Sequence, residues 1–367
     1  MSRSRQPKVA SAFVWATGQD DNLGDSLLRR PLTRSVSTAS GLEVFVGGAS
    51  DEFLEGLAPP PNATLHRGFA RWAVSAAASA LVRRTVLVVN AGEVRVSRRG
   101  AVRMSTIVLA AALAWFRGGG IVWVGAGVPN PAGWLSLPYR WVGRSASVLY
   151  WRDEVSVAIR PGSRVAPDWA FGEGPDVPAW TPLGQRTHVG VVLRGDRETP
   201  SDEWIRWVRA LADAAGLRLL VAVQVRRDTK RAAELAERLG ADVVEWHPGV
   251  GHAAQEARVR QAYAMCSAVI GDRLHGLIVA ATEGAVPLGW VETSGGKVGR
   301  HFASVGYETA GRFEGAAVED YPDARLVVES LRTGEHVRVG HLIERTRSQL
   351  DDVRQELGSF LNGPGGG

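Results

Sequence analysis

Short apolar runs alternate with longer helical segments along almost the whole chain, and this alternation limits the fold more than any other feature. Strands joined by helices of this length run parallel within a sheet that the helices cover. We therefore predict an α/β protein whose sheets are largely parallel. The predicted strands are residues 10–16, 42–45, 85–89, 121–124, 147–150, 188–193, 217–223, 243–245, 268–270 and 286–290.

A stretch rich in proline and glycine interrupts the alternation near the middle of the chain. With 367 residues the chain is long for one domain and long enough to form two. Two Rossmann-like domains place a cleft between the carboxyl edges of their sheets, and ligands prefer such clefts. We predict an N-terminal α/β domain over residues 1–170, a linker over 171–185, a C-terminal α/β domain over 186–340, a C-terminal helix over 341–362 and a disordered tail over 363–367.

The composition argues against several classes of protein. No apolar run reaches the roughly 18 residues that cross a bilayer, and the longest candidate, residues 104–116, is predicted to be a buried helix. The single cysteine, Cys266, can form no internal disulfide, so we expect folding in the cytoplasm. The net charge of +5 suits anionic partners, although arginines spread over a solvated surface explain it equally well. No nucleic-acid-binding signature accompanies the charge, so no nucleic-acid partner is expected.

The segment Ser267–Gly276 places an arginine and a histidine where open α/β sheets bind anions. An apolar run ends there, Arg273 and His275 follow at once, and an alanine-rich helical segment begins. These side chains therefore lie at the carboxyl end of a strand and the amino end of a helix. A fixed guanidinium beside a proton-transfer group suits chemistry on a phosphorylated or carboxylated substrate.

Two more cations follow predicted strands in the second half of the chain. Arg194 ends the strand at 188–193, at the same level as Arg273, so that the two arginines would grip one anion. Lys297 lies in a glycine-containing loop after the strand at 286–290. Its mobile charge suits phosphate, and on spacing alone a surface lysine is about equally expected. His247 and His252 have no third ligand near them, so we predict no metal site.

Polar motifs follow strands of the first half as well. Asn22, Gly24 and Asp25 come directly after the first strand, where they either cap the next helix or form a polar loop that faces the cleft. Arg152 and Asp153 end the strand at 147–150. They pair with each other, cap a helix, or contact a ligand, and the sequence alone favours one of the first two roles.

In their order along the chain, these motifs resemble the polysaccharide pyruvyl transferase family. Each motif is common by itself, whereas the ordered set is much more specific. Residues 90–93 and the loop 292–296 depart from the family pattern, and both departures concern the choice of acceptor. The resemblance rests on Asn-x-Gly-Asp at 22–25, a glycine-rich turn at 125–129, Arg-Asp-Glu-x-Ser at 152–156, Pro-Asp-x-Ala-Phe at 167–171, Arg194, Arg-Leu-His at 273–275 and Lys-Val at 297–298.

The resemblance implies a fold similar to the two-domain glycosyltransferase B type and a ketal-forming reaction. Pyruvate would pass from phosphoenolpyruvate, the donor substrate, to two hydroxyls of a sugar in a cell-surface glycan or its precursor. Phosphate would be released, and neither a metal nor another cofactor would be needed. The implied catalytic residues are His275 as the acid, Arg273 and Asp25, and the implied substrate-binding residues are Arg194, Lys297, Asn22, Gly24, Arg152 and Asp153.

Two other functions fit the same residues. A glycosyltransferase would use the arginines and the lysine to hold the diphosphate of a nucleotide sugar, and a non-catalytic sugar-binding protein would keep the fold alone. We expect a cytoplasmic enzyme and leave open a peripheral contact with the inner membrane face. The acceptor sugar, its attachment to a lipid, the ketal position and the oligomeric state are open as well.

Overall fold

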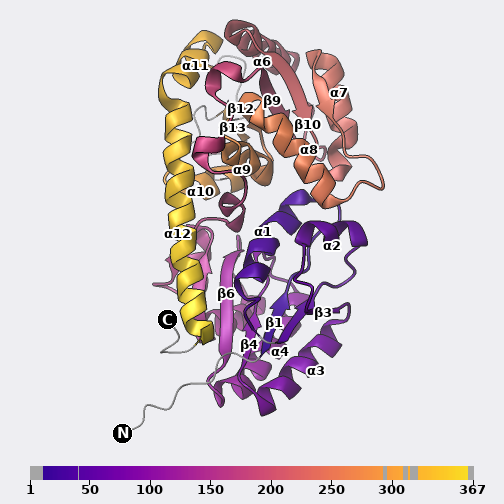
Figure 1. The fold of residues 1–367 in the computed structure, drawn as a ribbon, viewed down its shortest axis with the longest axis vertical. Coiled ribbons are helices and arrows are strands. Elements are labelled where there is room, and N and C mark those ends of the chain that lie inside the picture. The colour runs from indigo at the N-terminus through magenta and orange to yellow at the C-terminus, as the bar shows by residue number, and fades with distance from the viewer. Residues whose placement is uncertain (1–10, 40, 292–295, 309–312, 315–320, 363–367) are drawn as a thin grey trace. The chain divides into compact units, whose positions relative to one another are not determined.

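The computed structural model describes residues 11–39, 41–291, 296–308, 313–314 and 321–362 (Figure 1). The chain forms two compact units, here called the N-unit and the C-unit. The N-unit comprises Met1–Gln19, Asp25–Trp169 and Gln349–Gly367, and the C-unit comprises Asp20–Gly24 and Ala170–Ser348. Residues 171–185, predicted as a linker, are therefore part of the C-unit. The predicted tail, 363–367, lies outside the described residues. Among the helices that are described, none is long and apolar enough to span a membrane.

The N-unit is built on a parallel sheet with the order β3-β2-β1-β4-β6-β7-β8, and β5 also pairs with β6. From β1 the chain first moves to one side of the sheet, through β2 and β3, and then to the other side, starting with β4. The switch point of this sheet thus lies between β1 and β4, where α/β proteins bind ligands. The strands are β1 (Ser11–Trp15), β2 (Gly41–Phe45), β3 (Ala63–His66), β4 (Thr85–Val88), β5 (Gly92–Glu93), β6 (Gly120–Gly127), β7 (Ala146–Trp151) and β8 (Arg164–Val165).

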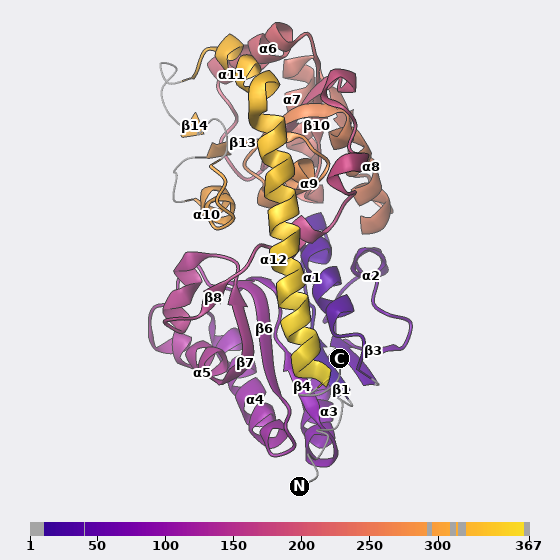
Figure 2. The ribbon, with the colours of Figure 1, turned by 60° about the vertical axis from the view of Figure 1, so that its left-hand side comes forward.

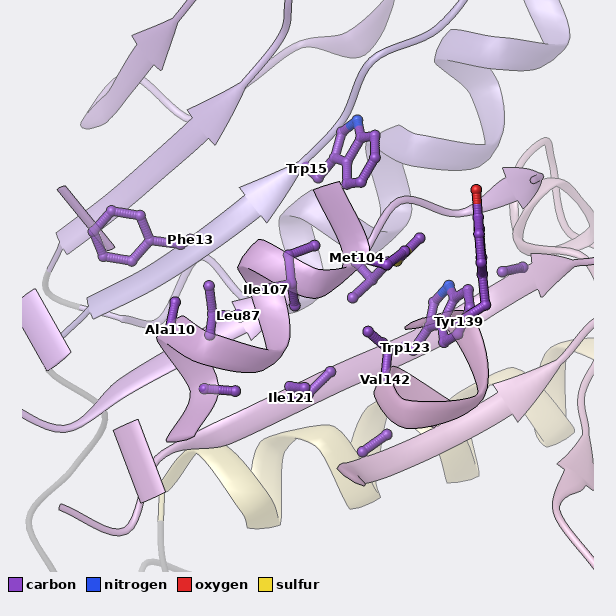
Figure 3. Packing of buried hydrophobic residues seen from close by; sticks show 14 of the residues in the cluster. Phe13, Trp15, Leu87, Met104, Ile107, Ala110, Ile121, Trp123, Tyr139 and Val142 are labelled. Atoms are coloured by element: carbon purple, nitrogen blue, oxygen red, sulfur yellow. The ribbon is translucent and has the colours of Figure 1, made fainter. Parts of the chain in front are cut away.

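Helices α3, α4 and α5 cover one face of this sheet, with α4 between the other two (Figure 2). Met104, Ile107 and Ala110 of α4 point onto the strands, toward Ile121 and Trp123 (Figure 3). Burial of each large apolar side chain contributes about 1.5–3 kcal/mol, so this layer anchors the unit. The helices are α1 (Leu23–Ser35), α2 (Asp51–Leu57), α3 (Phe69–Val82), α4 (Arg98–Trp115), α5 (Leu137–Ser145) and the last part of α12 (His336–Asn362), with short 3₁₀ turns at Trp134–Ser136 and Glu154–Ile159.

The C-unit repeats this plan with a parallel sheet in the order β11-β10-β9-β12-β13-β14. Its switch point lies between β9 and β12. Together the two sheets confirm the predicted α/β class. The strands are β9 (His188–Val192), β10 (Arg218–Ala222), β11 (Asp242–Val244), β12 (Cys266–Gly271), β13 (Val286–Val291) and β14 (Phe313–Glu314), and the helices are α6 (Asp202–Ala215), α7 (Thr229–Leu239), α8 (His252–Ala264), α9 (Leu274–Thr282), α10 (Lys297–Ala303), α11 (Ala324–Ser330) and the first part of α12.

Candidate active site

The switch point of the C-unit brings Arg194 and Arg273 to neighbouring positions. Arg194 follows β9, Arg273 follows β12, and these two strands are paired. Asp272 links the strand ends: its backbone N–H donates to the carbonyl of Val192 at 3.3 Å, and its carboxylate accepts from the backbone N–H of Arg194 at 2.8 Å. The sheet topology therefore gathers two arginines that are 79 positions apart in the sequence.

Each of these guanidinium groups is held by a carboxylate. Nε and Nη2 of Arg273 donate to the buried Asp228, at 2.8 and 2.7 Å, and Asp228 also accepts from the backbone N–H of Gly195 at 2.8 Å. Nε and Nη2 of Arg194 donate to Asp196 at 2.8 and 2.7 Å. In the part of the chain that the structure describes, Nη1 of each arginine donates to no protein group.

The charges of this cluster shift the pKa values of its members. The hydrogen bonds between Arg194 and Asp196 raise the pKa of the guanidinium and hold the pKa of the carboxyl well below its usual range. Burial raises the pKa of Asp272 to about 6, and the neighbouring Arg273 and the N–H of Arg194 oppose that rise. Asp272 therefore changes charge close to neutral pH, beside both arginines.

His275 lies in the first turn of α9, and its side chain is buried against Gly24. A Cβ atom at residue 24 would lie only 2.1 Å from Nδ1 of His275, so the close approach requires glycine. Asn22 fixes this glycine, because its side-chain oxygen accepts from the N–H of Gly24 at 3.1 Å and from the amide of Gln224 at 2.6 Å. Gly24 therefore packs directly against His275, and Asn22 holds the backbone of Gly24 in place.

The amino end of α9 adds positive potential beside this histidine. Within the described structure no side chain caps that end, and α9 is buried along its whole length. Backbone N–H groups and the helix dipole at such an end attract anions. Lys297 is the first residue of α10, which packs against α9 and β13, and its carbonyl oxygen lies 2.7 Å from Nδ1 of His301. Residues 292–295 of the predicted lysine loop lie outside the described residues.

Asp25 belongs to the N-unit and already has partners there. Its Oδ1 lies 2.9 Å from Nη1 of Arg29, and its Oδ2 accepts from the backbone N–H of Gln19 at 2.8 Å. Nε of Arg29 in turn donates to Asn90 at 2.7 Å. Asp25 is thus the first member of a polar chain that leads to Asn90, just beyond β4.

Arg152 and Asp153 hold the end of β7 in the N-unit, and both are buried. Nη1 of Arg152 donates to Asp168 at 2.9 Å. Asp153 accepts from the backbone N–H and the hydroxyl of Ser156, at 3.0 and 2.6 Å, and so caps the 3₁₀ turn that follows. A Cβ atom at Gly127 would lie within 3.0 Å of both side chains. These contacts account for the Arg-Asp-Glu-x-Ser motif as packing and capping.

A cavity of about 200 Å³ lies at the switch point of the N-unit sheet. Arg103 enters it from α4, with its guanidinium 5.4, 5.6 and 5.2 Å from the ring centres of Trp15, Phe45 and Phe69. Among the described residues, this guanidinium forms no ion pair. A second cavity, of about 360 Å³, is lined by Arg95, which it shares with the first cavity, and by Trp134. The first cavity is lined by Trp15, Asn90, Glu93, Val94, Arg95, Ser97, Arg99, Gly100, Arg103, Met104 and Tyr139.

Comparisons with known proteins identify the family. The family model of the polysaccharide pyruvyl transferases matches residues 17–286, which is more than half of the chain. The chain belongs to the polysaccharide pyruvyl transferase family. It is therefore a transferase that modifies polysaccharide, as the motifs predicted. A search of curated protein sequences found no match.

Solved structures confirm the glycosyltransferase B type of fold for this pyruvyl transferase family member. HepE from Anabaena, in complex with UDP and glucose, is 11% identical with a TM-score of 0.57, and the match covers 97% of this chain and 100% of that one. MnaA from S. aureus, solved with UDP, is 12% identical with a TM-score of 0.53, covering 96% and 97%. The glycotransferase of kitacinnamycin is 12% identical with a TM-score of 0.51, covering 96% and 98%.

The sequence analysis missed the carboxylates that hold the two arginines of this candidate site. Asp228 precedes α7 and Asp196 lies two residues after Arg194, yet neither stands in a motif that marks it. Asp228 follows β10, which neighbours β9, so a reading of strand ends across the sheet would have found it. The cavity around Arg103 has no comparable signal, because its aromatic residues come from β1, β2 and α3. Among the described residues no group of three metal-ligating side chains was found.

Proposed function

We propose that this enzyme transfers pyruvate from phosphoenolpyruvate to two hydroxyls of a sugar, forming a cyclic ketal and releasing phosphate. The observation that carries the proposal is the pair of guanidinium groups at the C-unit switch point, next to His275 at a helix end that no described side chain caps. Nη1 of each guanidinium donates to no group among the described residues. Phosphoenolpyruvate carries a carboxylate and a phosphate on one small skeleton. Two neighbouring cationic forks suit such a ligand.

The two arginines have different parts in donor binding. Arg273 is 14% exposed and locked to Asp228, which is 3% exposed, so we propose that it presents a fixed Nη1 to one acidic group of the donor. Arg194 is 32% exposed and Asp196 is 52% exposed, so an incoming anion can replace this carboxylate at small cost. Lys297 supplies a mobile charge for the phosphate. Asp272 lies beside both arginines, and in its protonated, neutral form it would not repel the anionic donor.

The proposed reaction begins when protonated His275 donates its proton to the methylene carbon of the donor. The C=C π electrons form the new C–H bond, and the cation left at C2 accepts an electron pair from the first sugar hydroxyl, whose proton goes to a base. The C2–O bond to phosphate then breaks with its electrons on the phosphate. The second hydroxyl attacks C2 and loses its proton. The two hydroxyl protons are thus balanced by the new methyl C–H and by the protonated phosphate.

For the acceptor we propose the 200 Å³ cavity of the N-unit. Trp15 and Tyr139 offer ring surfaces, and Asn90 offers an amide. Arg103 offers a guanidinium that forms no ion pair with any described residue, so the acceptor we favour is a sugar that carries a phosphate or a carboxylate. Glu93 lines the cavity and is the base we propose. Asp25 uses both carboxylate oxygens in protein contacts, so we give it an orienting role through Arg29.

Donor binding and turnover can be tested separately. Thermal unfolding of the purified protein with phosphoenolpyruvate or with UDP-glucose measures binding without an acceptor, since a ligand at about 100 times its Kd stabilises the fold by about 2.7 kcal/mol. Arg194→Ala and Arg273→Ala should lose the phosphoenolpyruvate shift, whereas His275→Gln should keep it. Stabilisation by UDP-glucose alone would favour a nucleotide-sugar glycosyltransferase instead, and no shift with either ligand would favour a non-catalytic binding protein.

Turnover is measured as phosphate release with hexoses, hexose 1-phosphates and hexuronic acids as acceptors, with the ketal identified by mass spectrometry. His275→Gln should abolish release while donor binding persists, and EDTA should leave the rate unchanged because the scheme needs no metal. Full activity of His275→Gln would refute its role as the acid.

A further inference from the structure

Helix α4 is apolar on both of its sides. Its inner side buries Met104 and Ile107 in the core of the N-unit. Its outer side exposes Val102 and Leu109, by 67% and 71%, and Phe116, the C-cap residue directly after the helix, is 89% exposed. Positions seven apart fall on one stripe of a helix, so these three side chains face solvent on the same side of α4. The expected buried helix at 104–116 is therefore buried on one side only.

Helices α3 and α5 flank α4 on its two sides (Figure 2). Both also expose apolar side chains. On one flank, α3 exposes Val74 and Leu81, and on the other flank α5 and the turn before it expose large aromatic side chains. Many large apolar side chains exposed on neighbouring helices mark a binding face. The exposed side chains of this face, here called the α3–α5 face, are Val74, Leu81, Val82, Val102, Leu109, Trp115, Phe116, Trp134, Leu137 and Trp141.

The charge on the α3–α5 face has one sign. Helices α3, α4 and α5 contain no Asp or Glu, whereas each contains arginine. An arginine-rich composition does not explain this, because α6 and α7 of the same chain carry acidic residues and have strongly amphipathic sequences. The arginines of the face are Arg71, Arg98, Arg99, Arg140 and Arg144, with Arg83 and Arg117 just beyond the ends of α3 and α4. Arg103 of α4 is not one of them, because its guanidinium lies in the 200 Å³ cavity.

We propose that the α3–α5 face docks on an anionic lipid surface. Its Trp, Phe and Leu side chains enter the boundary between headgroups and acyl chains, and its arginines bind lipid phosphates. A protein interface would concentrate apolar residues in a core depleted of charge. Here cations are interleaved with the apolar residues along the same helices, which is the pattern of helices that lie in a membrane surface.

The position of the 360 Å³ cavity agrees with this docking. Trp134 belongs to the α3–α5 face and also lines that cavity, together with Leu135, Val96 and Arg95. If the proposed function holds, a lipid-linked acceptor would have its carrier in the membrane and its sugar at the cavities of the N-unit. Vesicle binding does not depend on turnover, so the docking can be tested even if the proposed reaction is wrong.

The first experiment is flotation of the full-length protein with vesicles of phosphatidylcholine, with and without one quarter phosphatidylglycerol. We expect binding to the anionic vesicles that weakens with added salt, and at least tenfold weaker binding to the neutral ones. Leu109→Ser combined with Phe116→Ser should reduce anionic-vesicle binding about tenfold or more. The matched control, Leu326→Ser with Val337→Ser, changes side chains 64% and 59% exposed on the C-unit and should bind like the wild type.

A fluorescent label identifies the part of the protein that enters the lipid. The one native cysteine, Cys266, is buried, and burial raises the pKa of its thiol to about 12, so an environment-sensitive dye will react with an introduced cysteine. Dye on Phe116→Cys should shift to the blue with anionic vesicles, whereas dye on Leu326→Cys should not. The proposal is overturned by equal shifts at both positions, by no vesicle binding, or by dimers in light scattering that the Leu109→Ser and Phe116→Ser changes dissociate, since dimers would assign the face to a second copy.

Discussion

Gly24→Ala tests whether the backbone of one helix turn sets the position of His275. The structure predicts the conflict directly: the new Cβ atom would lie 2.1 Å from Nδ1 and 2.5 Å from Cγ of the imidazole. Ordinary contact begins at 3.4 Å, so the ring must retreat by about 1.3 Å. His275 is 6% exposed, and a buried ring cannot move that far without disturbing its neighbours.

Two opposing effects decide the change in stability. Alanine is favoured over glycine in a helix by up to about 1 kcal/mol, whereas overpacking a buried site costs about 1–3 kcal/mol. We therefore expect Gly24→Ala to lower the free energy of unfolding by up to about 2 kcal/mol. Under the proposed function, a displacement of about 1 Å at the acid should reduce kcat about 100-fold.

The matched control is Gly358→Ala, which lies in α12 and has open space around its Cα. It gains the same helix propensity with no clash, so the difference in unfolding free energy between the two variants isolates the overpacking cost at Gly24. Urea unfolding gives that difference, and phosphate release gives kcat. Equal stability of the two variants, with unchanged kcat for Gly24→Ala, would refute the conclusion that close packing against Gly24 sets the position of His275.

Three further predictions concern single side chains. The wild type should lose on the order of 2 kcal/mol of unfolding free energy as the pH rises from about 4 to about 6, because folded Asp272 keeps a proton that the unfolded chain has released. Asp272→Asn should remove this loss, and urea unfolding at both pH values measures it. Arg84→Ala should destabilise the N-unit by about 3 kcal/mol, because Arg84 donates to the last carbonyls of α12 at 2.9 and 2.7 Å, whereas the exposed Arg83→Ala should not, by the same unfolding assay. Arg103→Ala should raise KM about tenfold or more for anionic acceptors and leave neutral ones unchanged, with Arg98→Ala as the control in phosphate release.

The sequence predicted the sheets well because their strands depend on local apolar runs. It missed β3, whose four residues are half exposed at the sheet edge and form no apolar run. It also placed the loop Asp20–Gly24 in the N-terminal domain. That loop joins the C-unit through contacts such as Asp21 with Arg227, 206 positions apart, and no local pattern reveals a pairing over that distance.

The residues of the site that follow strands could be predicted from the sequence, whereas the carboxylates that bind them could not. Arg194 and Arg273 follow strands that neighbour each other in any sheet of this order, so position in the sequence sufficed. The carboxylates that hold them are recognisable only once β10 is known to lie beside β9. Likewise, the apolar run at 104–116 predicted a buried helix, yet it could not show that the outer side of α4 is exposed in the part of the chain that the structure describes.

Under the proposed function, the carboxylates that hold the two arginines limit how the donor can bind. Without bound carboxylates, the guanidinium groups of Arg194 and Arg273 would repel each other in a partly buried site. Asp196 and Asp228 prevent this repulsion. Asp228 cannot leave, because it is buried and also holds the backbone N–H of Gly195. Asp196 can leave, because it is half exposed and bonded across only two residues. Under that proposal, an arriving donor would exchange with Asp196 while Arg273 stays fixed, so that binding requires the motion of one side chain rather than the opening of the whole cluster.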